Sequence, residues 1–183
     1  MANKGRLIIV SGPSGAGKGT VLAEVFAKNP QMRYSVSATT RAPRPGENHG
    51  DQYFFITREE FEEKIQRGEM LEYAVYCDNY YGTPADFVEE QRNQGFDVVL
   101  EIEPCGASQV KSKCPEAISI FILPPSVEEL ERRLAARGTE DAEVVAARIE
   151  QAKHELTTAD QYDFKVVNDD VMRAADEIDK ILK

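Results

Sequence analysis

A lysine near the start of the chain stands among four glycines, which are Gly12, Gly15, Gly17 and Gly19. Glycines let successive backbone N–H groups turn toward one point, because no Cβ stands in the way. The apolar run 7–10 predicts a strand buried on both faces, and the apolar spacing in 21–27 predicts a helix. The N-terminus of that helix adds partial positive charge, and Lys18 adds a full charge. This segment therefore predicts a site for the outer phosphates of a nucleotide.

A strand, a glycine loop with a lysine, and a helix form the layout of a P-loop. This context disfavours the alternative of an ordinary glycine-rich turn with an exposed lysine. The strict pattern has Ser or Thr directly after the lysine, to hold Mg²⁺. Here Gly19 takes that position and Thr20 follows, so we expect Mg²⁺ to be held mainly by phosphates and water, with Thr20 as a candidate helper. The Lys-Gly-Thr order resembles the nucleoside monophosphate kinases, such as adenylate kinase.

Two arginines, Arg41 and Arg44, lie on a loop that prolines interrupt, within residues 41–46. A guanidinium group binds phosphate in a fork, and the prolines stiffen the loop that carries it. The loop follows a predicted strand that begins at Tyr34. It suits phosphate capture, and the alternative is a solvated basic loop.

Three glutamates stand in or at the end of predicted strands. Glu72 interrupts the apolar run 70–76, and Glu101 and Glu103 end the run 97–103. Ligands of open α/β sheets bind at the carboxyl ends of the strands. Glu101 and Glu103 are therefore placed for Mg²⁺ or for a substrate base. The alternatives are an edge-strand glutamate that faces solvent, and a strand end that meets water.

Two helices joined by a short polar turn are predicted at 127–136 and 142–156. Arg133 and Arg137 are four residues apart, so they share a helix face, and the second helix carries Arg148. Such a hairpin can close as a lid. The alternative is a set of ordinary surface ion pairs, which stabilise little.

The rest of the chain alternates strands with helices. Strands are predicted at 51–56, 117–123 and 164–167, helices at 58–67, 107–113 and 171–182, a capping box at Thr57 and Glu60, and a turn at 79–84 before a helix that starts near Pro84. This order predicts an α/β fold with a five-stranded parallel core sheet covered on both faces by helices. Residues 35–95 form a small mixed insertion, which we expect to act as a binding flap.

The composition limits the class of protein. The chain has 183 residues, 42% of them hydrophobic, which suits one α/β domain. Its net charge of −10 argues against general binding of nucleic acids or anionic membranes. It opens with no signal peptide, contains no apolar run of membrane-spanning length, and its three cysteines form no CxxC pair. We therefore expect a cytoplasmic protein with reduced thiols and no zinc site.

Several segments, in order, resemble one known family. They are Gly-Pro-Ser-Gly-Ala-Gly-Lys at 12–18, Ser-Val-Ser-Ala-Thr-Thr-Arg-Ala-Pro-Arg at 35–44, Gly-Asp-Gln-Tyr-Phe-Phe at 50–55, Asn-Tyr-Tyr-Gly-Thr at 79–83, Pro-Pro-Ser at 124–126, Arg-Gly-Thr at 137–139 and Val-Asn-Asp-Asp at 167–170. Together they resemble the guanylate kinase family, whose members transfer a phosphoryl group from ATP to GMP. The resemblance implies a single domain, 1–183, with the P-loop fold of nucleoside monophosphate kinases. Its expected parts are a core (1–34, 97–126 and 157–183), a GMP-binding subdomain (35–96) and a helical lid (127–156).

The same resemblance implies the site residues. For ATP they are Gly12, Pro13, Ser14, Gly15, Ala16, Gly17, Lys18, Gly19, Thr20, Arg133 and Asn168. For GMP they are Ser37, Arg41, Arg44, Tyr53, Glu72, Tyr81, Thr83 and Glu103, with Glu72 and Thr83 reading guanine. For the transferred phosphoryl group they are Lys18, Arg41, Arg137 and Arg148. Mg²⁺ is expected to be bound mainly through phosphates and water, with Thr20 and Glu101 as candidate protein ligands.

The resemblance implies direct in-line transfer from Mg-ATP to GMP, and to dGMP, for purine nucleotide recycling and GTP supply. The flap and the lid are expected to close over the substrates and exclude water, and Arg137→Ala is expected to lower kcat more than it weakens GMP binding. Two alternatives remain: another nucleoside monophosphate kinase, and a non-catalytic guanylate-kinase-like interaction module. The chain departs from the family pattern at Glu101 and Glu103, which are usually aspartates, and at Pro104 and Cys105.

Overall fold

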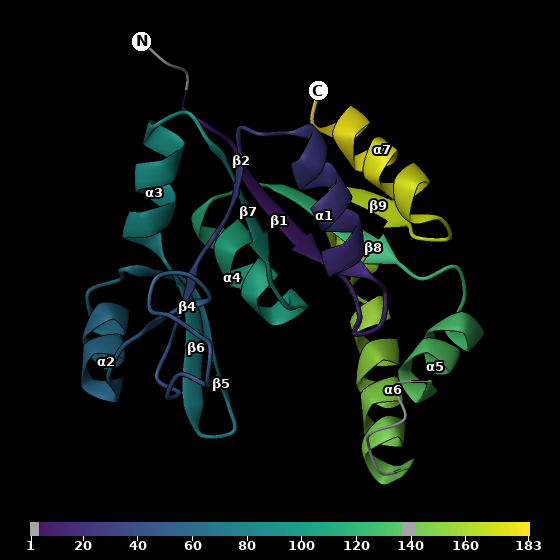
Figure 1. Ribbon diagram of the computed structural model, residues 1–183, viewed down its shortest axis with the longest axis horizontal. Helices are drawn as coiled ribbons and strands as arrows, with labels where there is room; N and C mark the ends of the chain where they lie inside the picture. Colours follow the sequence, from purple (N-terminus) through teal and green to yellow (C-terminus); the bar gives the residue numbers. More distant parts are fainter. Residues whose placement is uncertain (1–3, 137–141) are drawn as a thin grey trace. The chain divides into compact units, whose positions relative to one another are not determined.

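The structure is a computed structural model, and it describes residues 4–136 and 142–183. The strands are β1 (Leu7–Ser11), β2 (Met32–Tyr34), β3 (Ser37–Thr39), β4 (Tyr53–Phe55), β5 (Met70–Tyr76), β6 (Asn79–Pro84), β7 (Asp97–Glu101), β8 (Ile118–Leu123) and β9 (Phe164–Val167). The helices are α1 (Lys18–Lys28), α2 (Arg58–Gln66), α3 (Ala85–Asn93), α4 (Pro104–Lys113), α5 (Val127–Ala135), α6 (Ala142–Leu156) and α7 (Val171–Ile181), with a short 3₁₀ helix at Ala159–Gln161 (Figure 1).

Five strands form one sheet in the order β2-β7-β1-β8-β9, which confirms the predicted five-stranded parallel sheet. β1 pairs in parallel with β8, from Ile8 opposite Ile118 to Ser11 opposite Phe121. β8 pairs in parallel with β9, and β2 pairs in parallel with β7. Because parallel neighbours need a crossover connection, the helices between these strands follow from the sheet order.

The chain divides into two compact units. The first holds Gln31–Leu100 and Cys105–Ala117 together with the chain up to Leu7. The second holds Ile8–Pro30, Glu101–Pro104 and the described part of Ile118–Lys183.

The second unit is built on strands that are buried on both faces. Ile8, Ile9, Val10 and Ile120 have no exposed surface, as the apolar run 7–10 predicted. Helices α1 and α7 lie side by side (Figure 1), and α7 buries Ala174, Ala175 and Ile178. Helices α5 and α6 pack together through a small cluster of Leu130, Leu134 and Ala152.

The first unit contains a second sheet, with four strands in the order β4-β3-β6-β5. Its core cluster comprises Ala38, Phe61 and Met70, so helix α2 packs against one face of this sheet through Phe61. The capping box predicted for α2 is present, because Thr57 accepts from the Glu60 backbone N–H and the Glu60 side chain accepts from the Thr57 N–H.

Two local predictions are wrong. Residues 79–84 form strand β6 and not a turn, because the chain reverses two residues earlier, at Cys77 and Asp78, which both have positive φ (47° and 61°). The segment after Tyr34 is also not one strand. Tyr34 ends β2, which begins at Met32 and joins the parallel sheet, and the next strand, β3, begins at Ser37 and joins the mixed sheet.

Within residues 4–136 and 142–183, no helix combines the length and the apolar character that crossing a membrane requires.

Candidate active site

The glycine loop between β1 and α1 has a backbone that requires glycine. Gly15 and Gly17 have φ values of +89° and +83°, in the left-handed region that side chains with a Cβ disfavour. At Gly12 a Cβ would lie 2.4 Å from the carbonyl oxygen of Ile122, and at Gly17 it would lie 2.5 Å from Nδ2 of Asn168. The loop is therefore seated closely against its own unit, with α1 beginning at Lys18.

Lys18 lies over this loop. Its Nζ donates to the carbonyl oxygens of Gly12 at 2.7 Å and Pro13 at 3.3 Å. Burial lowers the pKa of Lys18, while the nearby carboxylates of Glu101, Glu155 and Glu103 act in the opposite direction.

Three predicted site residues contact the glycine loop or one another. Asn168 is 3% exposed and donates through Nδ2 to the carbonyl oxygen of Ala16 at 2.8 Å. Arg148, on α6, donates through Nη2 to Oγ of Ser14 at 2.9 Å. Arg133, on α5, donates at 3.5 Å to the backbone carbonyl of Asn168. Helix α6 thus brings Arg148 to the glycine loop, and α5 brings Arg133 to the backbone of Asn168, which itself contacts the loop.

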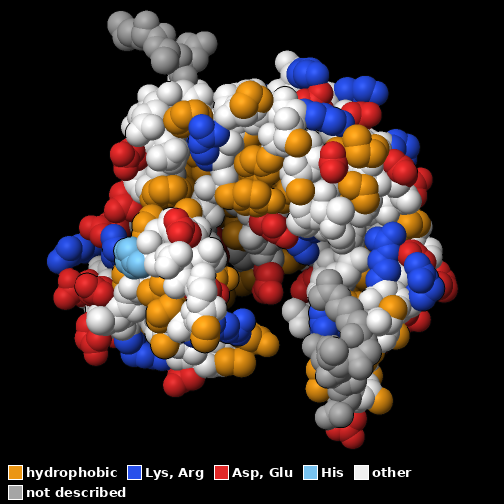
Figure 2. All heavy atoms as spheres, in the orientation of Figure 1, with side chains coloured by type: hydrophobic (Ala, Val, Ile, Leu, Met, Phe, Trp, Pro, Cys, Tyr) orange, Lys and Arg blue, Asp and Glu red, His pale blue; other side chains and the backbone are white. Residues whose placement is uncertain are grey.

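Other predicted site residues of the second unit are more exposed to solvent than Asn168. Thr20, Glu101 and Glu103 are exposed. Arg137 lies outside the described residues. On the face drawn in Figure 2, basic and acidic side chains are interspersed.

In the first unit, strand pairing gathers five of the predicted GMP residues on one face of the mixed sheet. Ser37 lies opposite Tyr53, and Thr83 lies opposite Glu72. Tyr81 lies opposite Thr39, two residues along β3 from Ser37. Because alternate residues of a strand share a face, these hydroxyl and carboxylate side chains line one surface.

Arg41 extends over the same face. Its guanidinium group lies 5.6 Å from the ring centroid of Tyr53 and 5.7 Å from that of Phe55, and its Nη2 donates to Glu47 at 3.0 Å. Glu47 also accepts from the backbone N–H of Arg44 at 2.8 Å. The Arg44 N–H and the Arg41 guanidinium hold the pKa of Glu47 below its usual value, against the effect of its partial burial.

Glu47 is a contact that the sequence reading missed. It fixes the arginine loop from within, and the only available signal was an acidic residue three positions after Arg44.

Glu72 is buried, with 7% of its surface exposed, so the alternative of a solvent-facing edge glutamate is wrong. Its Oε1 accepts a hydrogen bond from Oγ1 of Thr83 at 2.6 Å. Helix α4 approaches the other carboxylate oxygen at Gly106, where a Cβ would lie 2.7 Å from Oε2. A buried carboxylate is costly unless its oxygens find donors, and this packing holds it in one orientation.

Helix α4 also holds the backbone of β5. Gln109 accepts from the Tyr73 N–H at 3.2 Å and donates to the Tyr73 carbonyl at 3.0 Å. Lys113 donates to the carbonyl oxygens of Met70 at 2.8 Å and Leu71 at 3.0 Å. The sequence reading missed Gly106, Gln109 and Lys113. Their spacing of three and four residues, which places them on one helix face, was the available signal.

These features define a P-loop kinase of the nucleoside monophosphate type. They are a glycine loop with its lysine at the start of a helix, helices beside it that carry arginines, and a separate sheet with a buried carboxylate. The family model for guanylate kinase matches residues 4–183. The chain belongs to the guanylate kinase family.

Individual relatives agree with this. The chain is 55% identical to the guanylate kinase of Streptococcus pneumoniae (strain ATCC BAA-255 / R6) over all of this chain and 88% of that protein. It is 52% identical to the guanylate kinase of Lactococcus lactis subsp. lactis (strain IL1403), over all of this chain and 89% of that protein. The crystal structure of guanylate kinase from Anaplasma phagocytophilum superposes with a TM-score of 0.72 at 34% identity, covering 98% of this chain and 85% of that one.

Proposed function

We propose that this protein transfers the γ-phosphoryl group of ATP to GMP. The observation that carries the proposal is the buried carboxylate of Glu72, which is held by Thr83 on a sheet face together with tyrosines, Ser37 and Arg41. Membership of the guanylate kinase family supports the same reaction.

Glu72 and Thr83 would read the base. Guanine offers two donors on one edge, N1–H and the 2-amino group, and a carboxylate accepts both together. Each carboxylate oxygen has more than one acceptor site, so the bond from Thr83 leaves room for guanine. Adenine offers no such pair of donors at that edge, so the arrangement selects GMP over AMP.

The remaining residues would hold the phosphates. The GMP phosphate would be bound by Ser37, Arg41, Arg44, Tyr53 and Tyr81. Glu103 would lie near the guanine base. The ATP phosphates would be bound by the backbone of residues 12–20 and by Lys18, with Arg133 and Asn168 on the ATP side. The residues 35–96 would form the GMP-binding part and 127–156 the lid.

Mg²⁺ would neutralise the ATP phosphates. The carboxylates of Glu101, Glu103 and Glu155 lie near enough to Lys18 to raise its pKa. Mg²⁺ prefers hard oxygen ligands such as these. The exposed Thr20 hydroxyl and Glu101 are the candidates to hold it, directly or through water.

The transfer needs positioning and charge neutralisation more than proton removal. The attacking oxygen of GMP is already anionic, so no strong general base is required. Lys18, Arg41, Arg137 and Arg148 would neutralise the charge that spreads over the transferred group. The same site would accept dGMP, and in a cytoplasmic setting the reaction would serve purine nucleotide recycling and GTP supply.

The test is ADP formation from Mg-ATP with GMP, dGMP, AMP, UMP or CMP as acceptor, for the wild type, Glu72→Gln and, as a matched control, Glu59→Gln. Glu59 is exposed on α2, outside the predicted site. Strong turnover with guanine nucleotides, weakened only by Glu72→Gln, is the expected result. Turnover with AMP or a pyrimidine nucleotide would replace the proposal with another monophosphate kinase. A folded protein that binds GMP without any turnover would indicate an interaction module.

A further inference from the structure

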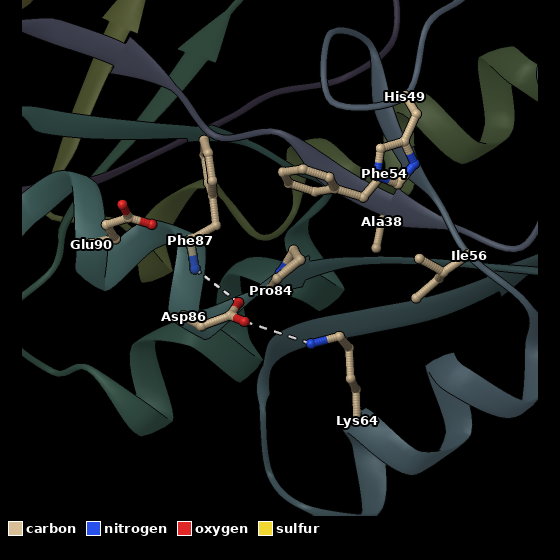
Figure 3. A pocket seen from close by; sticks show the side chains of 9 residues that line it. All are labelled: Ala38, His49, Phe54, Ile56, Lys64, Pro84, Asp86, Phe87 and Glu90. Atoms are coloured by element: carbon tan, nitrogen blue, oxygen red, sulfur yellow. Dashed lines mark hydrogen bonds and ion pairs between the residues drawn. The ribbon is translucent and has the colours of Figure 1, made fainter.

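The first unit contains a cavity of about 320 Å³, here called the reverse-face pocket, lined by residues other than those proposed for ATP or GMP. Its apolar wall comprises Ala38, Phe54, Ile56, Pro84 and Phe87 (Figure 3). Its volume is within the range of pockets that hold small molecules.

The pocket lies behind the proposed GMP face because side chains alternate along a strand. Ala38 sits between Ser37 and Thr39 on β3, and Phe54, which pairs opposite Ala38, sits between Tyr53 and Phe55 on β4. Ala38 and Phe54 therefore point to the opposite side of the sheet from Ser37 and Tyr53. The pocket is a separate site, open to a different ligand.

Aromatic rings shape the pocket for a flat molecule. The rings of Phe54 and Phe87 have centroids 5.4 Å apart at an interplanar angle of 68°. His49 meets Phe54 edge-on, with centroids 5.6 Å apart. Because these rings are inclined to one another, they present both ring faces and ring edges to the pocket. A planar aromatic ligand packs favourably against either.

The polar side of the pocket is acidic. Lys64 Nζ lies 3.6 Å from Asp86 Oδ2 and 3.5 Å from Glu69 Oε2. Glu90 also lines the pocket, four residues after Asp86 on the same face of α3 (Figure 3). The pocket lining therefore carries one ammonium group, on Lys64, and two carboxylates, on Asp86 and Glu90, with Glu69 beside Lys64. Carboxylates outnumber ammonium groups here, so the local charge favours a cation. Aromatic faces attract cations as well.

We propose that the reverse-face pocket binds a small planar aromatic molecule that carries a protonated amine. The ring packs beside Ala38 and against the Phe54–Phe87 pair, and the ammonium group lies toward Asp86 and Glu90. This proposal does not rest on the phosphoryl transfer reaction, and its test needs no nucleotide.

The chain contains no tryptophan, so indole fluorescence excited at wavelengths that tyrosine does not absorb reports a bound probe without background from the protein. The experiment titrates the full-length protein into tryptamine and follows the anisotropy and emission maximum of the probe. Indole-3-acetate, which has the same ring with a negative charge, is titrated in parallel. Saturable binding of tryptamine with one site, at least tenfold tighter than indole-3-acetate, is the expected result.

Variants locate the site. Ala38→Leu fills the pocket and should abolish saturable binding, whereas Ala146→Leu, at an exposed position of α6, should leave it unchanged. Because a larger side chain at Ala38 could disturb folding, the double variant Asp86→Asn with Glu90→Gln gives a second test that keeps the packing. It should weaken tryptamine about fivefold to tenfold, as expected for two exposed charges, and Glu59→Gln should not.

Three results would overturn the proposal: no saturable binding of tryptamine up to its solubility limit, equal or tighter binding of indole-3-acetate, or binding that the folded Ala38→Leu and Asp86→Asn/Glu90→Gln proteins both retain.

Discussion

Replacing Gly106 with alanine would test whether α4 fixes the carboxylate that is proposed to read guanine. The new Cβ would lie 2.7 Å from Oε2 of Glu72, 3.3 Å from Cδ and 3.4 Å from Cγ. Contacts under 3.0 Å require movement, and here the carboxylate must move, although it is buried and bound to Thr83 at 2.6 Å. A hydrogen bond to a charged group is worth about 1.5–3 kcal/mol, so losing one to guanine corresponds to about a 10- to 100-fold lower kcat/KM for GMP.

The free energy of unfolding should change little. Alanine favours a helix over glycine by about 1 kcal/mol, which offsets part of the clash. Steady-state kinetics with GMP, measured alongside urea unfolding, therefore distinguishes a displaced Glu72 carboxylate from a general loss of stability. The KM for ATP should stay near the wild-type value, and Ser108→Ala, at an exposed position of the same helix, should leave both quantities unchanged. An unaltered kcat/KM for GMP in Gly106→Ala would refute the reasoning.

Three further predictions follow from contacts of the second unit. Arg148→Ala removes the bond to Ser14 and a cation beside the phosphate loop, so kcat should fall at least tenfold with little change in the KM for GMP; an unchanged kcat would contradict the assignment. Asn168→Ala leaves the buried carbonyl of Ala16 without its donor, so urea unfolding should report a loss of about 1–3 kcal/mol together with a higher KM for ATP, and equal stability would show that the bond is dispensable. Hydrogen bonds from Arg132 and Arg133 lower the pKa of Glu129 from 4.5 to about 2. Because the folded pKa is depressed, this stabilisation is present above pH 4.5 and is lost as the pH falls toward 2; Glu129→Gln should therefore be less stable at neutral pH and lose less stability over that acidic interval, and identical unfolding curves would exclude the effect.

The sequence predicted the parts of the fold that depend on local pattern. The apolar runs 7–10 and 117–123 correspond to β1 and β8, and the Thr57 and Glu60 pair predicted the start of α2. The hairpin at Cys77 and Asp78 was missed because neither residue is glycine, although both adopt positive φ.

The parts of the candidate site that depend on a short sequence motif were predictable. The parts that depend on packing between distant segments were not. The glycine loop and Lys18 were evident from spacing alone. The burial of Glu72 was not, because it depends on α4, which arrives more than thirty residues later and meets the carboxylate at Gly106. The pairing of Glu47 with Arg41 likewise depends on how one loop folds back on itself.

The bonds from α4 to β5 also bear on solubility. β5 is an outer strand of the mixed sheet, and three of its seven residues are aromatic or β-branched, which makes it the kind of edge onto which a second chain can add. Gln109 takes both the N–H and the carbonyl of Tyr73, and Lys113 takes the carbonyls of Met70 and Leu71. The helix thereby occupies the groups that a foreign strand would need, along the first half of β5. The second half, where Val75 and Tyr76 are 59% and 71% exposed, depends on the tight turn that follows it. Loosening α4 would therefore expose the edge of β5 and lower the concentration at which the protein begins to aggregate.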